Sequence, residues 1–480
     1  MARLTDEQVN QIASQLVNML EKPQSGFSGP RPSPAEEAHG LGVFRTIDEA
    51  VRAAQKAHDT FRTMDLAKRE RIIHSIRAKM LEHAQELARR AHEETGMGRA
   101  EDKVLKNRLV SEKTPGPEML KPIAYTGDHG LTLEERAPYG VIGAITPSTN
   151  PTSTIICNAI GMISAGNAVV FNVHPSAKSV SVYNVELLNQ AITAAGGPVN
   201  LVATVAQPTI ESAQELMKHP GVRLLTVTGG AEVVRVAMSS GKRAICAGPG
   251  NPPVVVDETA DVEHAAQCII QGAAMDNNII CTDEKGIFVV ESVADALIAA
   301  FMRRDAVVLK PFQIAQLESV IFKETRGNRR PAVMERNLIG QNVQTILARI
   351  GIQLEDRFRL AVAPVPLEHP LVWSEQMMPI IPLVRMPNVN QAIDVAQETE
   401  HGFRHTAIMH SKNLDNLDRM ARVMNCSIFV KNGSSLAGLG YGGEGYCSFT
   451  IASPTGEGLT GPHSFSRVRR CVLVDHFRIV

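Results

Sequence analysis

Cys281 is the residue of this chain best placed to act as a nucleophile. It lies in the segment 275–285, Met-Asp-Asn-Asn-Ile-Ile-Cys-Thr-Asp-Glu-Lys, which leads into the apolar run 286–290. A cysteine reacts as its thiolate, so a catalytic one must be partly exposed and easily ionised, whereas a single buried cysteine is usually inert. The assignment of Cys281 therefore depends on what other parts of the chain supply.

Two turns that follow predicted strands offer further chemistry. Residues 141–145 lead into Thr146, Pro147, Ser148, Thr149 and Asn150, whose hydroxyl and amide groups could hold an oxyanion. Residues 224–227 lead into the turn 228–230, Thr-Gly-Gly, before the helical run 231–237. Glycines let a ligand approach a helix amino terminus, where free N–H groups favour pyrophosphate. Most tight turns of this kind, however, bind no ligand.

Short β-branched runs alternate with helical lengths from Gly140 onward, which predicts parallel sheets covered by helices. In such folds ligands bind beyond the carboxyl ends of the strands, where both turns lie. The predicted strands are 141–145, 168–171, 201–205 and 224–227, then 254–256, 287–290, 360–362, 380–384, 406–409 and 427–430. Before them, a capping box at Thr46 and Glu49 opens one packing helix, and one longer helix is expected through residues 72–87. We expect an α/β protein of two large domains with a boundary near residues 251–253.

The amino terminus has its own pattern. Apolar residues repeat at helical spacing through residues 5–20, and a stretch rich in Pro, Gly and Ser follows. This predicts a short amphipathic helix on a tether. Docking of its apolar face on another protein is favoured over packing on the core. A helix on a membrane surface normally has flanking basic residues, and this stripe has few.

Composition excludes several classes of function. The chain has 480 residues, of which 44% are hydrophobic and 21% charged, and its formal charge of -1 gives no footprint for nucleic acid or an anionic membrane. The seven cysteines form no CxxC pair, which suits reduced thiols in a cytosol. No apolar run approaches the length of a membrane span, and no signal pattern is seen. A cytoplasmic protein with small partners is expected.

The motifs together resemble the aldehyde dehydrogenase superfamily. The resemblance covers about residues 42–480, and its carriers are the segments 138–151, 165–171, 227–230, 275–285 and 375–379. Residues 146–151 (Thr-Pro-Ser-Thr-Asn-Pro), 174–178 (His-Pro-Ser-Ala-Lys), 247–257, 277–281 and 454–458 are most similar to the CoA-acylating acetaldehyde and propionaldehyde dehydrogenases of bacterial microcompartments. In that family the detached helix is an encapsulation peptide that binds shell proteins in the compartment lumen.

The resemblance implies roles for individual residues. Cys281 would be the nucleophile that forms a thiohemiacetal and then an acyl thioester. The Cys281 backbone N–H and the side-chain amide of Asn150 would stabilise the oxyanion, although the hydrolytic relatives carry the Asn where this chain has Thr149. The remaining residues would bind the cofactors NAD and coenzyme A, with Glu375 on the nicotinamide ribose. They are Thr146, Pro147, Ser148, Thr149, His174, Val227, Thr228, Gly229, Gly230, Gly248 and Glu375.

Two departures from the hydrolytic relatives matter. Those enzymes use a Glu before a Gly-Gly pair to activate water, and this chain has Ala247 and Gly248 there. Without that base the thioester should persist until a thiol such as CoA arrives. His174 stands near the place of a Lys that contacts the adenine-side ribose, which leaves NAD or NADP open.

The implied function is NAD-dependent oxidation of a short-chain aldehyde to its acyl-CoA. The alternatives are hydrolytic oxidation to the acid, and a shell adaptor whose active site has lapsed. The implied domains are the encapsulation helix 1–20, a linker 21–41, a cofactor domain of 42–125 and 139–250, a catalytic domain 251–450, and oligomerisation strands 126–138 and 464–480 that in the superfamily pair across subunits of a dimer or tetramer.

Some patterns are expected to carry no function. The G-x-G-x-x-G at 438–443 lacks a strand-to-helix context, and Cys246 and Cys268 are expected in the core. His401, His405 and His410 crowd together, but strand alternation would direct the last two to opposite faces, so no metal site is expected.

Overall fold

The structure is a computed structural model that describes residues 41–479. The predicted amphipathic helix 5–20 and all but the last residue of the predicted linker 21–41 lie outside the described residues, as does Val480. None of the helices between residues 41 and 479 has the length and apolarity that a membrane crossing requires.

The first half of the described chain builds a parallel sheet in the strand order β1-β6-β5-β4-β7-β8. Parallel neighbours require helical crossovers, so the prediction of alternating strands and helices is confirmed here. The strands are β1 Val43–Phe44, β4 Val141–Ile145, β5 Ala168–Asn172, β6 Val202–Val205, β7 Val222–Thr228 and β8 Ala244–Ala247.

The second half builds another parallel sheet, in the order β11-β14-β15-β10-β9-β16-β17. Its strands are β9 Pro253–Val256, β10 Gly286–Val290, β11 Ala306–Val308, β14 Leu360–Pro364, β15 Ile380–Met386, β16 Thr406–His410 and β17 Ile428–Lys431. The chain passes from the first sheet to the second between β8 and β9, through residues 248–252. The predicted α/β class is confirmed, whereas the predicted domain limits stay a prediction.

Helices cover both sheets. Those of the first half are α2 Ile47–Phe61, α3 Leu66–Glu82, α4 Ala84–Thr95, α5 Ala100–Lys113, α6 Pro151–Ser164, α7 Lys178–Ala194, α8 Ile210–Lys218 and α9 Ala231–Met238. Those of the second are α10 Val262–Ala273, α11 Glu291–Met302, α12 Pro311–Ile321, α13 Val343–Ala348, α14 Val389–Thr399 and α15 Leu414–Met424. Short 3-10 turns are η1 Pro117–Met119, η2 Pro175–Ala177, η3 Met275–Asn278, η4 Arg336–Leu338, η5 Pro370–Trp373 and η6 Ser435–Leu439.

The start of α2 confirms the predicted capping box, because Glu49 N–H donates to Thr46 Oγ1 at 3.2 Å and Thr46 N–H donates to the Glu49 carboxylate at 3.3 Å. The expectation of one helix through 72–87 is wrong. The helix breaks at His83, which leaves helical geometry and contacts Glu86 in the first turn of α4. The break lets α3 and α4 pack separately against α5 and α7.

The second sheet is buried on both faces, as a parallel sheet requires. Val254, Val256, Ile287 and Val289 join the large core that also fills the first sheet. Their neighbours in sequence, such as Val255 and Phe288, join a separate core under α12, α13 and α14. This alternation follows from the two-residue period of a strand.

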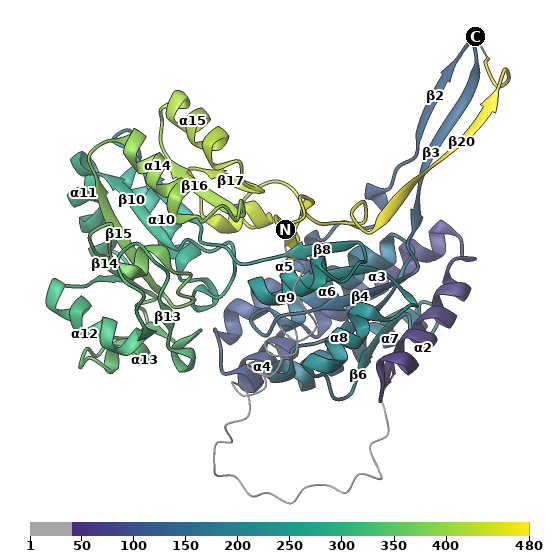
Figure 1. The fold of residues 1–480 in the computed structure, drawn as a ribbon, viewed down its shortest axis with the longest axis horizontal. Helices are drawn as coiled ribbons and strands as arrows, with labels where there is room; N and C mark the ends of the chain where they lie inside the picture. The colour runs from purple at the N-terminus through teal and green to yellow at the C-terminus, as the bar shows by residue number, and fades with distance from the viewer. Residues whose placement is uncertain (1–40, 480) are drawn as a thin grey trace, which may run out of the picture. The chain divides into compact units, whose positions relative to one another are not determined.

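An antiparallel sheet is formed by β2 Ile123–Gly127, β3 Gly130–Pro138 and β20 Ser466–Val474, which run side by side in Figure 1. The predicted strand at the carboxyl terminus therefore ends at Val474 rather than at 480, and it pairs with β3 of the same chain. Pairing across subunits stays a prediction. Two small pairs complete the fold, β12 Phe322–Glu324 with β13 Val333–Met334 and β18 Ile451–Ala452 with β19 Gly458–Leu459.

Candidate active site

Cys281 lies on a turn between η3 and β10 and is partly exposed. The turn is fixed to the crossing between the two sheets, because Lys285 N–H donates to Pro252 O at 2.8 Å. A methyl group added to Gly250 would stand 2.7 Å from the carbonyl oxygen of Cys281, so only glycine lets the two backbones approach this closely. The candidate nucleophile thus lies just beyond the end of β8.

The residues before the cysteine adopt an unusual backbone. Asp276, Asn277 and Asn278 all have positive φ, at 46°, 57° and 66°. Asp and Asn enter this left-handed region more readily than other non-glycine residues, but it still costs energy and needs support. Lys103 and Lys106 pair with Asp276, and the Asn278 amide donates to Ala273 O and Glu284 O at 2.8 and 3.0 Å.

The Asn277 amide donates at 2.8 Å both to Gly340 O and to Asn342 Oδ1. The three polar side chains of residues 276–278 are therefore anchors of the turn, which explains the pair of asparagines before the nucleophile.

Lys285 and Glu284 hold the other side of the turn. Lys285 Nζ is buried and donates to the backbone and side-chain oxygens of Asn278 at 2.6 Å each. Both carboxylate oxygens of Glu284 accept from Ser435, at 2.8 Å from its N–H and 2.7 Å from its hydroxyl. Burial raises the pKa of Glu284 to about 7. Because its oxygens are bound to Ser435, Glu284 is an anchor and is poorly placed to activate water.

The surroundings of Cys281 disfavour its charge at rest. Burial of the thiol, helped by the carboxylates of Glu375 and Asp283, raises the pKa of Cys281 to about 12, against a smaller opposing effect of Lys285. A thiol with this pKa is protonated at neutral pH, so catalysis requires a nearby proton acceptor.

His405 is a candidate for that acceptor. Its ring lies beside Gly250, where an added methyl group would be 3.1 Å from His405 Cγ. Burial lowers its pKa to about 4, so the ring is neutral at pH 7, and its Nε2 is buried without a hydrogen-bond partner among residues 41–479. The ring Nδ1 is 2.8 Å from the Thr406 hydroxyl.

Asn150 is the amino-terminal cap of α6 and is buried. Its Oδ1 accepts from Lys106 Nζ at 2.6 Å, and its Nδ2 donates to the Thr149 hydroxyl at 3.2 Å. Lys106 in turn pairs with Asp276, so the structure links Asn150 to the nucleophile segment. The neighbouring Thr146 hydroxyl is buried without a partner in the described part of the chain, whereas residues 147–149 are half-buried.

The turn after β7 fits a dinucleotide phosphate. Gly230 caps α9 without a side-chain hydrogen bond, and a methyl group added there would meet open space. The N–H groups of the first turn of α9 are thus available to an anion. Gly229 N–H donates to Ala247 O at 3.1 Å, which holds this turn against the end of β8 next to Gly248. Val227 is buried below it, and the Thr228 hydroxyl is 3.0 Å from that of Thr450.

Glu375 and His174 occupy different places. Glu375 is half-buried, and burial raises its pKa against the opposing effects of Lys285 and of the Gly250 N–H. It therefore belongs with Cys281 and Gly250. His174 is exposed beyond β5, where its Nδ1 accepts from Ser176 N–H at 3.2 Å. Within the described residues, no hydrogen bond or ion pair joins it to the Cys281 turn.

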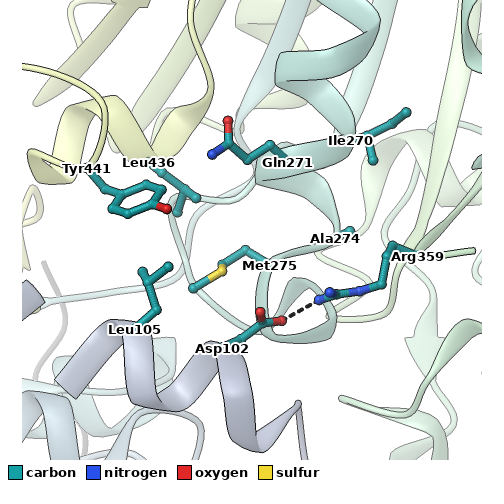
Figure 2. Close-up of a pocket in the computed structure, with 9 residues that line it drawn as sticks. All are labelled: Asp102, Leu105, Ile270, Gln271, Ala274, Met275, Arg359, Leu436 and Tyr441. Carbon is teal, nitrogen blue, oxygen red and sulfur yellow. Dashed lines mark hydrogen bonds and ion pairs between the residues drawn. The ribbon is translucent and has the colours of Figure 1, made fainter. Parts of the chain in front are cut away.

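A cavity of about 220 Å³ lies beside the nucleophile segment (Figure 2). Its residues come from α5, α10, the segment before Cys281, Arg359 and the loop around η6; they are Asp102, Leu105, Ile270, Gln271, Ala274, Met275, Arg359, Leu436 and Tyr441. Figure 2 shows the ion pair of Asp102 with Arg359 at one side and the apolar side chains around Met275. Cys281 itself does not line this cavity.

Comparison with known proteins identifies the family. Residues 42–316, more than half of the chain, match the aldehyde dehydrogenase family. The chain belongs to this family. An acetylating acetaldehyde dehydrogenase, EutE of Salmonella typhimurium, is 51% identical over 93% of this chain and 95% of its own length.

Two solved structures show the same fold within the aldehyde dehydrogenase family. A Rhodopseudomonas palustris propionaldehyde dehydrogenase with bound CoA and an acylated cysteine has a TM-score of 0.88 and 49% identity, covering 90% of this chain and 98% of its own. A propionaldehyde dehydrogenase from the Clostridium phytofermentans fucose utilisation microcompartment has a TM-score of 0.89 and 45% identity, covering 92% and 100%. The predicted resemblance to CoA-acylating aldehyde dehydrogenases is confirmed.

The sequence did not reveal Lys106, Lys285 or His405 as parts of this aldehyde dehydrogenase site. A lysine in a predicted helix is expected on its solvent-exposed face, so the sequence gives no sign that Lys106 is buried. From the sequence alone, His405 stands out only as one of three crowded histidines that could be metal ligands. Residues 41–479 hold no group of three or more His, Cys, Asp or Glu placed to bind a metal, and His401 and His410 contact Trp373 O and the His264 ring instead.

Proposed function

We propose that this chain oxidises a short-chain aldehyde with NAD and transfers the acyl group to coenzyme A through a thioester on Cys281. The observation that carries the proposal is the surroundings of Cys281. The cysteine is partly exposed on an anchored turn, and the adjacent end of β8 carries Ala247 and Gly248, which offer no carboxylate to activate water. A thioester there lacks the water-activating base that the hydrolytic relatives carry at this position, and it is open to a thiol.

The first half of the reaction forms the thioester. Cys281 loses its proton to an acceptor, for which we propose the neutral His405 ring beside Gly250, and the thiolate attacks the carbonyl carbon of the aldehyde. The resulting oxyanion accepts hydrogen bonds from Asn150 Nδ2 and from the Cys281 N–H. The chemistry that NAD supplies when bound is acceptance of the hydride from this tetrahedral carbon, which leaves an acyl thioester on Cys281.

The second half transfers the acyl group. The thiol of CoA attacks the thioester carbonyl as its proton passes to a base, and the oxyanion uses the same two donors. Collapse breaks the bond to the Cys281 sulfur and releases acyl-CoA, and the Cys281 thiolate takes up that proton. Val227, Thr228, Gly229 and Gly230 are assigned to the dinucleotide, with Glu375 on the nicotinamide ribose. His174 and residues 146–149 complete the nucleotide side, and Gly248 leaves room for the thiol.

The cavity beside Met275 is proposed as the approach of the aldehyde. It borders the nucleophile segment, and the apolar side chains of Leu105, Ile270 and Leu436 line it beside the Asp102–Arg359 ion pair, which suits a short chain that carries one polar group. Its volume of about 220 Å³ is small, which favours short aldehydes over long ones.

The decisive experiment is a single turnover without CoA. NADH should appear in a burst that is stoichiometric with enzyme, followed by slow turnover, and CoA should restore steady turnover. Mass spectrometry should find the acyl group on the peptide that contains Cys281. Rapid acid release without CoA would favour the hydrolytic alternative, with Glu375 as the first suspect for the base. Absence of NADH under all conditions would favour a lapsed site.

The cellular setting is part of the proposal. Residues 5–20 are proposed to bind shell proteins and to place the enzyme in the lumen of a bacterial microcompartment. Deleting residues 1–20 should keep turnover in solution and abolish co-purification with shell proteins. An unfolded or aggregated truncation would show that the stripe is core packing instead.

A homo-oligomer is proposed from the sheet of β2, β3 and β20. Its β20 strand exposes Val468, Val472 and Val474, which alternation along the strand directs to one face, and subunit interfaces cover apolar surfaces of this kind. Light scattering should give a mass of two or four chains, and a monomer would refute this assignment.

A further inference from the structure

A buried ionic cluster joins α5 to the nucleophile segment. Lys103 and Lys106 lie three residues apart on one face of α5, and their side chains are only 2% and 3% exposed. Both ammonium groups pair with the same carboxylate oxygen of Asp276, which is fully buried; the Lys103 distance is 2.9 Å. The other oxygen of Asp276 accepts from Arg99 N–H at 2.7 Å.

The two lysines differ in one contact. Lys106 Nζ also donates to Asn150 Oδ1 at 2.6 Å, whereas Lys103 has no bond to Asn150 within the described residues. One carboxylate cannot by itself satisfy two buried ammonium groups, each of which has three donors, so a further acceptor is needed. Asn150 supplies it for Lys106.

This contact decides which way the Asn150 amide faces. With Oδ1 held against the ammonium group, Nδ2 must point to the opposite side, where it now reaches the Thr149 hydroxyl. The flipped amide would place its NH₂ donors against the Lys106 donors, which a buried site disfavours strongly. A charge-assisted hydrogen bond is also stronger than a neutral one, so the orientation is held firmly.

We propose that Lys106 is a positioning residue for the acylation step. Lys106 fixes the orientation of the Asn150 amide as an oxyanion donor and connects Asn150 to the nucleophile segment through Asp276. The inference rests on the proposed roles of Asn150 and Cys281. It places no contact between Lys106 and the substrate. It explains why α5, a helix remote in sequence from both residues, carries two buried lysines on one face.

A merely structural role would be shared by the two lysines, so Lys103 provides the matched control. Lys103→Met and Lys106→Met each leave Asp276 with one ammonium partner and should lower the melting temperature by similar amounts. The burst rate of NADH formation should separate them. Removal of an oxyanion donor costs roughly 100-fold or more, and a misoriented donor should cost about tenfold or more relative to Lys103→Met.

A positioning effect also has a kinetic signature. The loss in Lys106→Met should fall equally on kcat and kcat/KM for the aldehyde, because an oxyanion donor acts in the transition state. NAD binding, followed by fluorescence titration, should match that of Lys103→Met. In an Asn150→Ala background the change Lys106→Met should slow the burst no further than Lys103→Met does.

The outcomes distinguish this inference from the proposed function. Equal burst rates in the two lysine variants, or a Lys106 effect that persists in the Asn150→Ala background, would overturn the positioning role while leaving Cys281 and Asn150 in place. A wild-type burst rate in Asn150→Ala would refute the oxyanion assignment itself. If Lys106→Met does not fold, Lys106→Arg keeps the charge beside Asp276 but changes the donor geometry. Positioning then predicts a slower burst at near-native stability, and an unchanged burst would overturn it.

Discussion

Gly250 is the position where a single methyl group tests the active-site geometry most directly. In Gly250→Ala the added carbon would lie 2.7 Å from the Cys281 carbonyl oxygen and 3.1 Å from His405 Cγ. Ordinary contacts begin at 3.4 Å, so the nucleophile backbone and the crossing must separate by about 0.7 Å. The φ of Gly250 is not in the left-handed region, so the clash is the main effect of the change.

The expected loss of activity follows from that displacement. A shift of about 1 Å in a reacting group can cost roughly 100-fold, so we expect the burst rate of Gly250→Ala to fall on the order of 10- to 100-fold. This corresponds to about 1.4 to 2.8 kcal/mol of activation free energy. The assay is rapid-mixing measurement of NADH with saturating aldehyde and NAD.

Gly438→Ala serves as the control, because its added carbon would lie 2.3 Å from Ile428 Cγ2 and touches neither Cys281 nor His405. Both variants should lose about 1 to 3 kcal/mol of stability through overpacking, but Gly438→Ala should keep its burst rate. A wild-type burst rate in Gly250→Ala would refute the argument that the crossing and the nucleophile turn are in close contact.

Three further predictions concern the nucleophile, acid stability and an anchor. Cys281→Ala should abolish NADH formation in the spectrophotometric assay with little change in melting temperature, whereas Cys268→Ala should retain turnover. Burial lowers the pKa of His410 to about 4 from 6.5, so the unfolded chain binds the proton first; stability should be intact above pH 6.5 and fall by up to about 3 kcal/mol as the pH drops through 4. Urea unfolding at several pH values should show a shallower loss in His410→Gln. Gly272→Ala would place a carbon 2.0 Å from the Glu284 carboxylate and should lower the free energy of unfolding by about 1 to 3 kcal/mol, measured by urea titration.

The fold was largely predictable because its signals are local. Strand β4 was predicted with its observed limits, and β10 differs by one residue, since β-branched runs between turns report parallel strands directly. The break at His83 was missed, because hydrophobic spacing continues across it and only the packing of α3 and α4 requires two helices. The end of the carboxyl-terminal strand was missed for a similar reason, since apolar residues continue beyond the last pairing position at Val474.

The site was only partly predictable. The nucleophile and its turn are contiguous in sequence, so Cys281 and the glycines after β7 could be singled out. The bond from Lys106 to Asn150 spans 44 positions, and the pairing of Lys106 with Asp276 spans 170. No periodicity along the chain encodes such contacts. His405 likewise becomes a candidate proton acceptor only because the tertiary fold brings its ring next to Gly250.

The left-handed backbone conformation of Asp276, Asn277 and Asn278 affects how the enzyme is inactivated by heat. Each such residue costs on the order of 1 kcal/mol or more, and the cost is offset by the hydrogen bonds and ion pairs that α5, the end of α10, residues 284–285 and the loop near Gly340 provide. The sheets carry no such stored strain and are held by extensive apolar burial. Warming can therefore release the turn while the sheets persist, so that catalytic lifetime and folding stability become separate properties of this molecule.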